Sequence, residues 1–180
     1  MYKRQIALHA LHDRDDYNKM TEVKARKRLE KAKNIVEMMS GQKTVGFRAP
    51  RFQRPSLKII KDLGFKYDSS LHPSPMPGRY SGKGKLVPHV DEESGLTVLP
   101  VSVVPGLRLP LSWIWFRMLP KGYIRWGASL VEANFDYLCL YFHPWDFVDL
   151  SKYKSSLPAG FTVGGKLSLI HISEPTRLRR

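Results

Sequence analysis

Short apolar segments alternate with helical segments along this chain, and this alternation restricts the fold more than any other feature. Residues 4–11 and 43–50 have the composition of short strands, and residues 21–39 between them repeat apolar side chains at helical spacing. Thr21 is suited to cap that helix and Gly41 to end it. Strands that alternate with helices predict an α/β fold in which the strands run parallel.

The same alternation continues further along the chain. Residues 55–65 predict a short helix that begins at Pro55 and ends near Gly64. Residues 71–95 are dense in Pro, Gly, Ser and Lys, which predicts an irregular region. The chain has 180 residues and no visible internal repeat, so one domain with a sizeable core is expected. The other expected elements are strands at 66–71, 96–103 and 134–145 and a helix at 110–119.

The composition is that of a folded protein, with 42% hydrophobic and 11% aromatic residues. No apolar run is long enough to span a membrane, and the first residues lack the pattern of a signal peptide. A single cysteine, Cys139, excludes an internal disulfide and a zinc site built from cysteines. The sequence leaves the compartment open between the cytoplasm and the cell envelope.

The net charge of +14 is large for a chain of this size and predicts attraction to a polyanion. Much of this charge lies in residues 24–33, KARKRLEKAK, on the first expected helix. Two interpretations remain open: a solvated outer helix face, or a surface that binds an anionic polymer. No motif that reads a nucleic-acid groove accompanies the charge, so no nucleic-acid partner is expected.

The C-terminal segment is expected to be foreign to the protein. Residues 167–177, LSLIHISEPTR, resemble the read-through translation of a sequencing-library adapter. We therefore assign residues 1–165 to the domain and residues 166–180 to a tail that is not native, and we exclude His171 from functional reasoning. This interpretation implies that the natural C-terminus is missing and that the N-terminus is suspect.

Polar side chains recur at the ends of the expected strands. In a barrel of parallel strands these ends meet at one mouth, where active sites are built. A cluster at that mouth is therefore predicted from side chains that lie far apart in the sequence. The residues at or just beyond expected strand ends are His9, Arg48, Asp68 and His143.

His143 ends a segment of alternating side chains. The more polar row of this segment is expected to face the barrel interior, and the aliphatic row is expected to pack under helices. An imidazole titrates near neutral pH, so His143 at the mouth is suited to act as a general acid; the alternative is a structural histidine at a strand end. The polar row is Tyr137, Cys139, Tyr141 and His143, and the other row is Leu138, Leu140 and Phe142.

The segments GFRAPRF, LGFKYDSSL and YLCLYFHPWDF, in this order, resemble the polysaccharide deacetylase family, the NodB-homology carbohydrate esterases. The resemblance covers nearly all of residues 4–164. It implies a distorted barrel of parallel strands that binds one divalent metal, usually zinc, and removes acetyl groups from N-acetylated sugars. The chain is therefore expected to be a metal-dependent hydrolase whose partner is an acetylated glycan.

The resemblance also implies a metal site near the N-terminus. His9 matches the family's first histidine ligand. The family usually has its second histidine ligand four residues later, where this chain has Asp13. His12 lies one position earlier, so either His12 or Asp13 is the candidate second ligand. The family's remaining aspartates, one ligand and one catalytic base, precede the first histidine. We therefore expect this chain to be an incomplete fragment that is inactive alone.

The resemblance assigns roles to further residues. Arg48 is expected to pair with the catalytic base, because its planar fork can grip a carboxylate at two points; the alternative is a surface salt bridge. Asp68 is expected to orient His143 or, alternatively, to cap the following turn. Pro50 and Trp145 are candidates for the wall of the substrate groove. A competing class is a non-catalytic barrel domain that binds a glycan or another polyanion through its basic surface.

Overall fold

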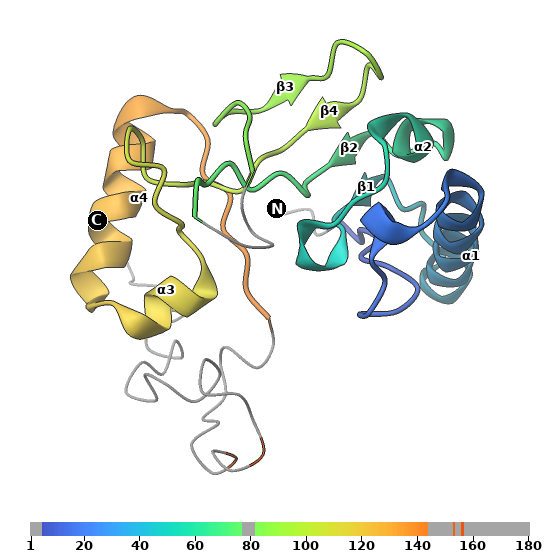
Figure 1. Ribbon diagram of the computed structural model, residues 1–180, viewed down its shortest axis with the longest axis horizontal. Coiled ribbons are helices and arrows are strands. Elements are labelled where there is room, and N and C mark those ends of the chain that lie inside the picture. The colour runs from blue at the N-terminus through green and yellow to red at the C-terminus, as the bar shows by residue number, and fades with distance from the viewer. Residues whose placement is uncertain (1–4, 77–81, 144–152, 154–155, 157–180) are drawn as a thin grey trace.

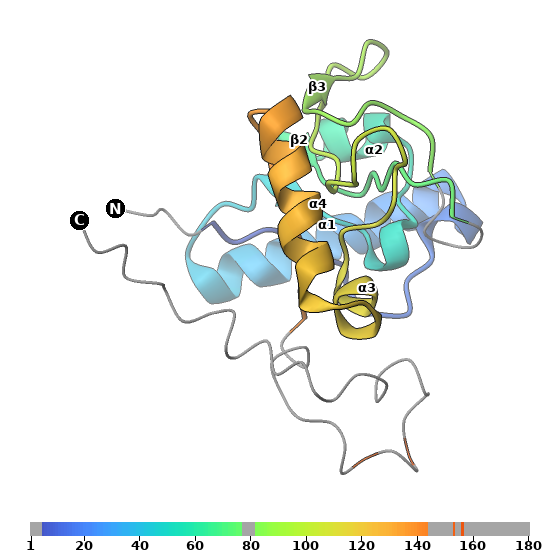
Figure 2. The same cartoon turned by 90° about the vertical axis from the view of Figure 1, so that its left-hand side faces the viewer.

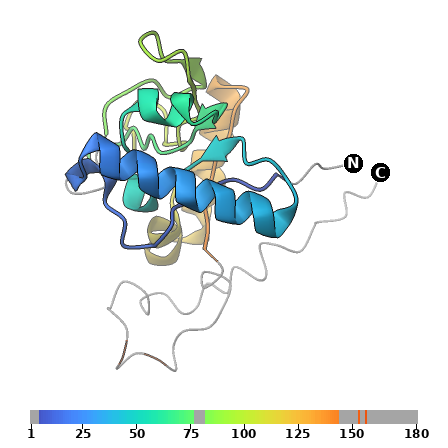
Figure 3. The same ribbon diagram turned by 90° about the vertical axis from the view of Figure 1, so that its right-hand side faces the viewer.

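The computed structural model describes residues 5–76 and 82–143, together with Tyr153 and Ser156. Helices α1 and α2 cover one end of a small open sheet, and α3 and α4 lie at the other end of the molecule (Figure 1). In the rotated views α4 lies in front of α1 (Figure 2) and α1 lies in front of α4 (Figure 3). The expected tail, 166–180, and Trp145 lie outside the described residues.

The described part contains four α-helices and four very short strands. Two 3-10 helices, Tyr17–Lys19 and Pro50–Phe52, precede α1 and follow β1 respectively. The α-helices are α1 (Glu22–Ser40), α2 (Leu57–Asp62), α3 (Trp113–Met118) and α4 (Lys121–Asn134). The strands are β1 (Gly46–Phe47), β2 (Tyr67–Asp68), β3 (His89–Val90) and β4 (Thr97–Val98).

The strands form one sheet in the order β1-β2-β4-β3. The pairs β1–β2 and β2–β4 are parallel, which confirms the predicted α/β class and, for these pairs, the predicted parallel strands. The pair β3–β4 is antiparallel, and β3 lies in a region expected to be irregular. The sheet is not closed within the described residues, so the expected barrel is not confirmed.

The prediction of a strand at residues 4–11 is wrong: in the described part of this segment, residues 5–11, only Leu8 pairs with the sheet. The segment joins the sheet through one isolated parallel bridge between Leu8 and Phe47. The Leu8 N–H donates to the Gly46 carbonyl at 2.8 Å, and the Arg48 N–H donates to the Leu8 carbonyl at 3.0 Å. Leu8 is buried whereas its neighbours on either side are exposed, so little apolar burial supports a longer ladder.

Helix α1 matches its prediction closely. The Thr21 side chain accepts the Lys24 N–H at 3.4 Å, and Gly41 ends the helix with a φ of 65°, in the left-handed region that glycine adopts readily. The buried side of α1 packs with Leu8, Phe47, Ile60 and Phe65 in one core. This core fixes α1 and α2 against the start of the sheet.

Helix α4 has no counterpart in the predicted elements. Two glycines, Gly122 and Gly127, lower the helical propensity of its sequence. At Gly127 a Cβ atom would lie 2.5 Å from Leu111 Cδ2, so glycine permits close packing against the preceding segment. A second core cluster here consists of Val104, Leu111, Phe116 and Val131.

The expected strand at 134–145 is also wrong as a ladder strand, as far as residue 143 is described. The Ser102 N–H donates to the Cys139 carbonyl and the Cys139 N–H donates to Ser102 Oγ, each at 2.9 Å. A side-chain acceptor thus replaces one backbone carbonyl of a regular ladder. The predicted alternation holds only in part: Leu140 packs in the second core and Phe142 contacts Phe116, but Leu138 and Phe142 are 38% and 39% exposed. No helix in the described part is both long and apolar enough to cross a membrane.

Candidate functional site

Three of the predicted site residues gather where parallel segments end. His9 follows the Leu8 bridge, Arg48 follows β1, and Asp68 is the last residue of β2. Because these segments are paired in parallel, their carboxyl ends lie at the same edge of the sheet. His9, Arg48 and Asp68 therefore lie at one edge of the sheet, whereas their predicted roles stay predictions.

His9 is oriented by the backbone of Arg48. Its Nδ1 lies 2.7 Å from the Arg48 carbonyl oxygen, so Nδ1 carries the proton and donates to it. Although the residue is exposed, neighbouring protein atoms desolvate the ring, and this desolvation lowers the pKa of His9 below its usual 6.5. The charges of Arg48 and His143 lower this pKa further, whereas the hydrogen bond to the carbonyl raises it. Nε2 remains available as a lone-pair donor, which is the arrangement found in metal-binding histidines.

His12 and Asp13 lie on the turn that follows His9. Their side chains approach each other, with His12 Nδ1 2.7 Å from Asp13 Oδ1, and both are exposed. Across the described residues no group of three or more histidine, cysteine or acidic side chains could hold a metal ion. These residues therefore do not form a closed metal site, and the choice between His12 and Asp13 as second ligand stays a prediction.

The Arg48 guanidinium is held by β2 and by the segment near Cys139. Its Nε donates to the Ser69 carbonyl at 2.8 Å, and its Nη2 donates to Ser69 Oγ at 2.6 Å. Nη2 also lies 3.4 Å from Cys139 Sγ, and the guanidinium lies 5.8 Å from the centre of the Tyr141 ring. Among the described residues no carboxylate pairs with Arg48, so the surface salt bridge weighed for it is not what holds it in place.

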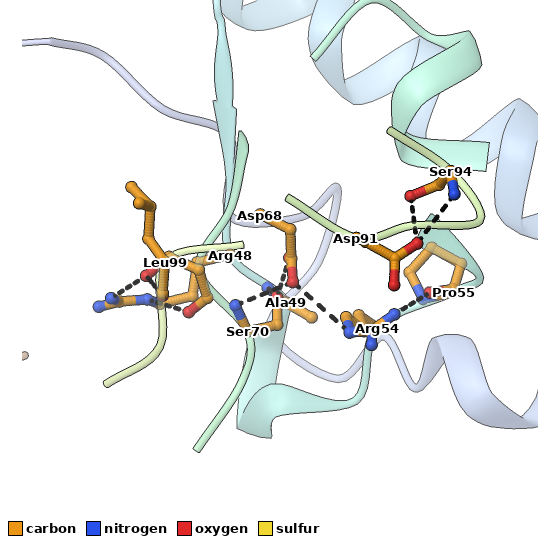
Figure 4. Close-up of polar contacts among 10 residues, drawn as sticks. Arg48, Ala49, Arg54, Pro55, Asp68, Ser70, Asp91, Ser94 and Leu99 are labelled. Carbon is orange, nitrogen blue, oxygen red and sulfur yellow. Dashed lines mark hydrogen bonds and ion pairs between the residues drawn. The ribbon is translucent and has the colours of Figure 1, made fainter. Parts of the chain in front are cut away.

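Asp68 is completely buried and is bound by Ser70 and Arg54. Its carboxylate accepts the Ser70 N–H at 3.2 Å and the Ser70 hydroxyl, and it lies 3.5 Å from Arg54 Nε. Ser70 Oγ in turn accepts the Ala49 N–H at 2.8 Å, which ties β2 to the loop after Arg48. In Figure 4 the two arginines approach this segment from opposite sides. Burial raises the pKa of Asp68, while the Ser70 hydrogen bonds and the Arg54 charge oppose that rise.

The contacts of Asp68 favour one of its two predicted roles. Acceptance of the N–H two residues ahead is the geometry of an Asx turn, which matches the predicted cap. Asp68 makes its polar contacts with Ser70 and Arg54, and it makes none with His143. Orientation of His143 by Asp68 therefore has no support in its contacts.

His143 reaches the site through a row of aromatic rings. Tyr141 meets His143 edge to face, with ring centres 5.9 Å apart, and meets Phe52 edge to face at 5.2 Å. Phe52 stacks on the buried ring of His72 at 5.4 Å. The charge of His143 is one of the smaller causes that lower the pKa of His9.

Phe52, His72 and Ser69 were not predicted as site residues from the sequence. Phe52 has a φ of 61° and the preceding Arg51 a φ of 54°, and this left-handed pair directs the loop after β1. A local pattern signalled Tyr141, which lies in the predicted polar row with His143. The predicted groove residue Pro50 is buried in the 3-10 helix Pro50–Phe52, whereas Trp145 lies outside the described residues.

Comparison with known proteins gives one family and several distant structural neighbours. A family model described as a domain of unknown function, DUF3473, matches residues 69–168. No curated protein matches the chain. A crystal structure described as a polysaccharide deacetylase from Mycobacterium smegmatis is similar, with 24% sequence identity and a TM-score of 0.43. The alignment covers 64% of this chain and 35% of that protein.

Two further crystal structures are similar over a larger part of the chain. One is described as a polysaccharide deacetylase from Pseudomonas aeruginosa PAO1, with 17% identity and a TM-score of 0.49. The other is Puue allantoinase, with 14% identity and a TM-score of 0.48. Each alignment covers 76% of this chain and 44% of the other protein. The chain thus spans less than half the length of the solved proteins that it matches.

Proposed function

Because the chain belongs to the DUF3473 family, a family associated with polysaccharide deacetylases, we propose that it is part of an enzyme that removes acetyl groups from the N-acetylated sugars of a polysaccharide. Membership confirms the family resemblance found in the sequence. The reaction proposed is hydrolysis of a C–N bond that is not a peptide bond. The substrate class, an acetylated glycan, is part of the proposal.

The observation that supports this proposal is the contact of His9 with Arg48 at one edge of the sheet, together with the Tyr141 ring, which lies next to both Arg48 and His143. In the proposed reaction a water oxygen bonds to the acetyl carbon, and the C–N bond breaks. Protonated His143 donates its proton to the departing amine nitrogen, and a carboxylate base takes the proton of the water. Arg48 stabilises the ionised form of that base through the part of its guanidinium that Ser69 does not occupy.

The family resemblance implies one divalent metal, and we propose zinc. When bound, such an ion acidifies water and polarises a carbonyl oxygen. His9 Nε2 is suited to bind it, because Nδ1 is already fixed by the Arg48 carbonyl. His12 or Asp13 would add a second ligand. We propose that the remaining ligand and the base come from carboxylates upstream of the present sequence, and that this chain alone is inactive.

The test compares this chain with the protein encoded by the genomic sequence that contains it. Each is incubated with acetylated chito-oligosaccharides, and released acetate and free amines are quantified with and without zinc. The longer protein should release equal amounts of both, and its His143→Gln variant should lose about 100-fold or more in rate. Absence of acetate release by the longer protein on every acetylated glycan tried would overturn the proposal.

One observation favours the competing binding function. On α1 the side chains of Arg26 and Arg28 pair with acidic partners, whereas Lys24, Lys27 and Lys31 are exposed and make no ion pair within the described part of the chain. A row of free lysines attracts anionic polymers. Metal-independent association with an acidic polysaccharide that weakens steeply with salt would support this function.

A further inference from the structure

We propose that Asp15 and Arg28 form a positioning pair that fixes the turn carrying His12 and Asp13 beside His9. The purpose of the pair rests on the proposed function, whereas its existence rests on geometry. Asp15 is 5% exposed, in contrast to His12 and Asp13, whose side chains are largely in solvent. A buried carboxylate is costly unless its oxygens are satisfied, so its contacts indicate what it holds.

The Asp15 carboxylate accepts hydrogen bonds from three residues, Arg28, His12 and Tyr17. Oδ1 accepts a hydrogen bond from Arg28 Nη2 at 2.6 Å. Oδ2 accepts the His12 N–H at 3.1 Å and the Tyr17 hydroxyl at 3.4 Å. The Asp15 N–H returns to the His12 carbonyl at 3.0 Å, which closes the turn from its other end. The backbone of His12 is therefore bound to Asp15 through both its N–H and its carbonyl.

These contacts attach the turn to two rigid elements. Arg28 lies within α1, on a helical turn next to the buried Leu29. Tyr17 is 2% exposed, and its ring meets Phe47 of β1 edge to face at 6.0 Å. Phe47 immediately precedes Arg48, whose carbonyl orients His9. One buried carboxylate thus links α1, β1 and the turn, and it sets where His12 and Asp13 stand relative to His9.

The side chains of His12 and Asp13 do not hold the turn themselves. Their closest contacts are with each other and with the adjacent N–H of Arg14, all on the turn. Their location therefore depends on the backbone that Asp15 binds. This dependence makes Asp15 a positioning residue that acts through His12 and Asp13, whichever of them serves as the second ligand.

The chain supplies a matched control on the same helix. Arg26 Nη2 lies 2.6 Å from a carboxylate oxygen of Asp62, the same separation as between Arg28 Nη2 and Asp15 Oδ1. The Arg26–Asp62 pair is exposed, with 42% and 40% of the two side chains accessible, and it joins α1 to α2 and not to the turn. Loss of this pair removes an arginine–aspartate contact from α1 without touching His12.

The experiment measures amide hydrogen exchange of His12 by NMR in the 180-residue chain and in Asp15→Ala, Asp15→Asn and Asp62→Ala variants. Asp15→Ala should speed exchange at His12 by about 10-fold or more, because the acceptor of its N–H is removed. Asp15→Asn keeps an acceptor oxygen and should restore most of the protection. Asp62→Ala should leave exchange at His12 unchanged. If Asp15→Ala does not fold, Arg28→Met provides the same test by loosening the carboxylate.

Zinc affinity of the longer protein encoded by the genomic sequence, measured by calorimetric titration, tests the purpose of the pair. Asp15→Ala should weaken zinc binding by about 10- to 100-fold, the range for residues that orient metal ligands, and Asp62→Ala should not. If the longer wild-type protein binds no zinc, the metal part of the proposed function fails, and exchange at His12 still decides the positioning pair. Unchanged exchange in folded Asp15→Ala and Arg28→Met would overturn the pair itself. Altered exchange with unaltered zinc affinity would overturn its positioning role.

Discussion

The Arg48 guanidinium grips Ser69 at two atoms, the carbonyl at 2.8 Å and Oγ at 2.6 Å. Ser69 Oγ in turn donates a hydrogen bond to the Leu99 carbonyl at 2.8 Å. Arg48 is thus joined to the end of β2 and to the segment after β4. The arginine that the sequence assigned to a carboxylate is therefore also a structural link across the sheet edge.

Substitution of Arg48 by lysine should destabilise the protein. A lysine ammonium cannot reproduce the planar fork, so at least one of the two bonds to Ser69 is lost. We expect the free energy of unfolding to fall by about 1–3 kcal/mol, measured by urea denaturation. The control is Arg26→Lys, whose exposed pair with Asp62 should cost less than about 1 kcal/mol. Equal losses at the two positions would contradict the structural role of Arg48.

The local part of the fold could be read from the sequence. Helix α1 has a cap at Thr21, apolar spacing and a stop at Gly41, and all three signals lie within or next to the helix itself. The ends of β1 and β2 were likewise placed from short apolar runs. Such features depend on neighbours in the chain, which is why periodicity and capping rules find them.

The partners of the site residues could not be read in the same way. Arg48 is bound by Ser69 and Cys139, which lie 21 and 91 residues away in the chain. The stack of Phe52 on His72 likewise joins segments that no periodic pattern relates. The predicted strand at 134–145 failed for a related reason: whether a segment forms a ladder depends on its neighbour, and here Ser102 offers a side-chain oxygen.

The buried Asp68 should make stability depend on pH in an unusual direction. Burial raises its folded pKa above the ordinary 3.8, so the folded protein holds this proton more tightly than the unfolded chain does. The contribution of Asp68 to stability therefore falls as pH rises above 3.8 towards the folded pKa. Asp68→Asn removes this dependence. Urea unfolding across that range should show wild type losing stability relative to Asp68→Asn as pH rises; a difference independent of pH would contradict the buried ionisable group.

Glu37 should show the opposite dependence. Its Oε1 accepts the Thr44 N–H at 2.9 Å and Oε2 lies 3.0 Å from Lys43 Nζ, and these contacts lower the pKa of Glu37 from 4.5 to about 2. The stabilisation is complete above pH 4.5 and is lost as pH falls towards 2. Glu37→Gln should therefore be less stable than wild type at neutral pH, with the gap closing in acid. Thermal unfolding of Glu30→Gln, an exposed position on the same helix, provides the control.

The backbone at Arg51 provides a test of the loop that carries Phe52. Arg51 is exposed and has φ 54° and ψ 21°, a left-handed conformation that costs an L-residue about 1–2 kcal/mol and costs glycine almost nothing. Arg51→Gly should therefore be more stable than Arg51→Ala by about 1 kcal/mol in urea denaturation.

At an ordinary helical position the alanine variant is more stable than the glycine variant, and Lys27 on the exposed face of α1 is such a position in the same protein. There the glycine variant should be less stable than the alanine variant by about 1 kcal/mol, because the helix disfavours glycine. Opposite signs at the two positions would establish the left-handed turn after β1. The same sign of the stability difference at both positions would mean that the Arg51 backbone is not left-handed. The backbone conformation that places the Phe52 ring between His72 and Tyr141 would then be wrong.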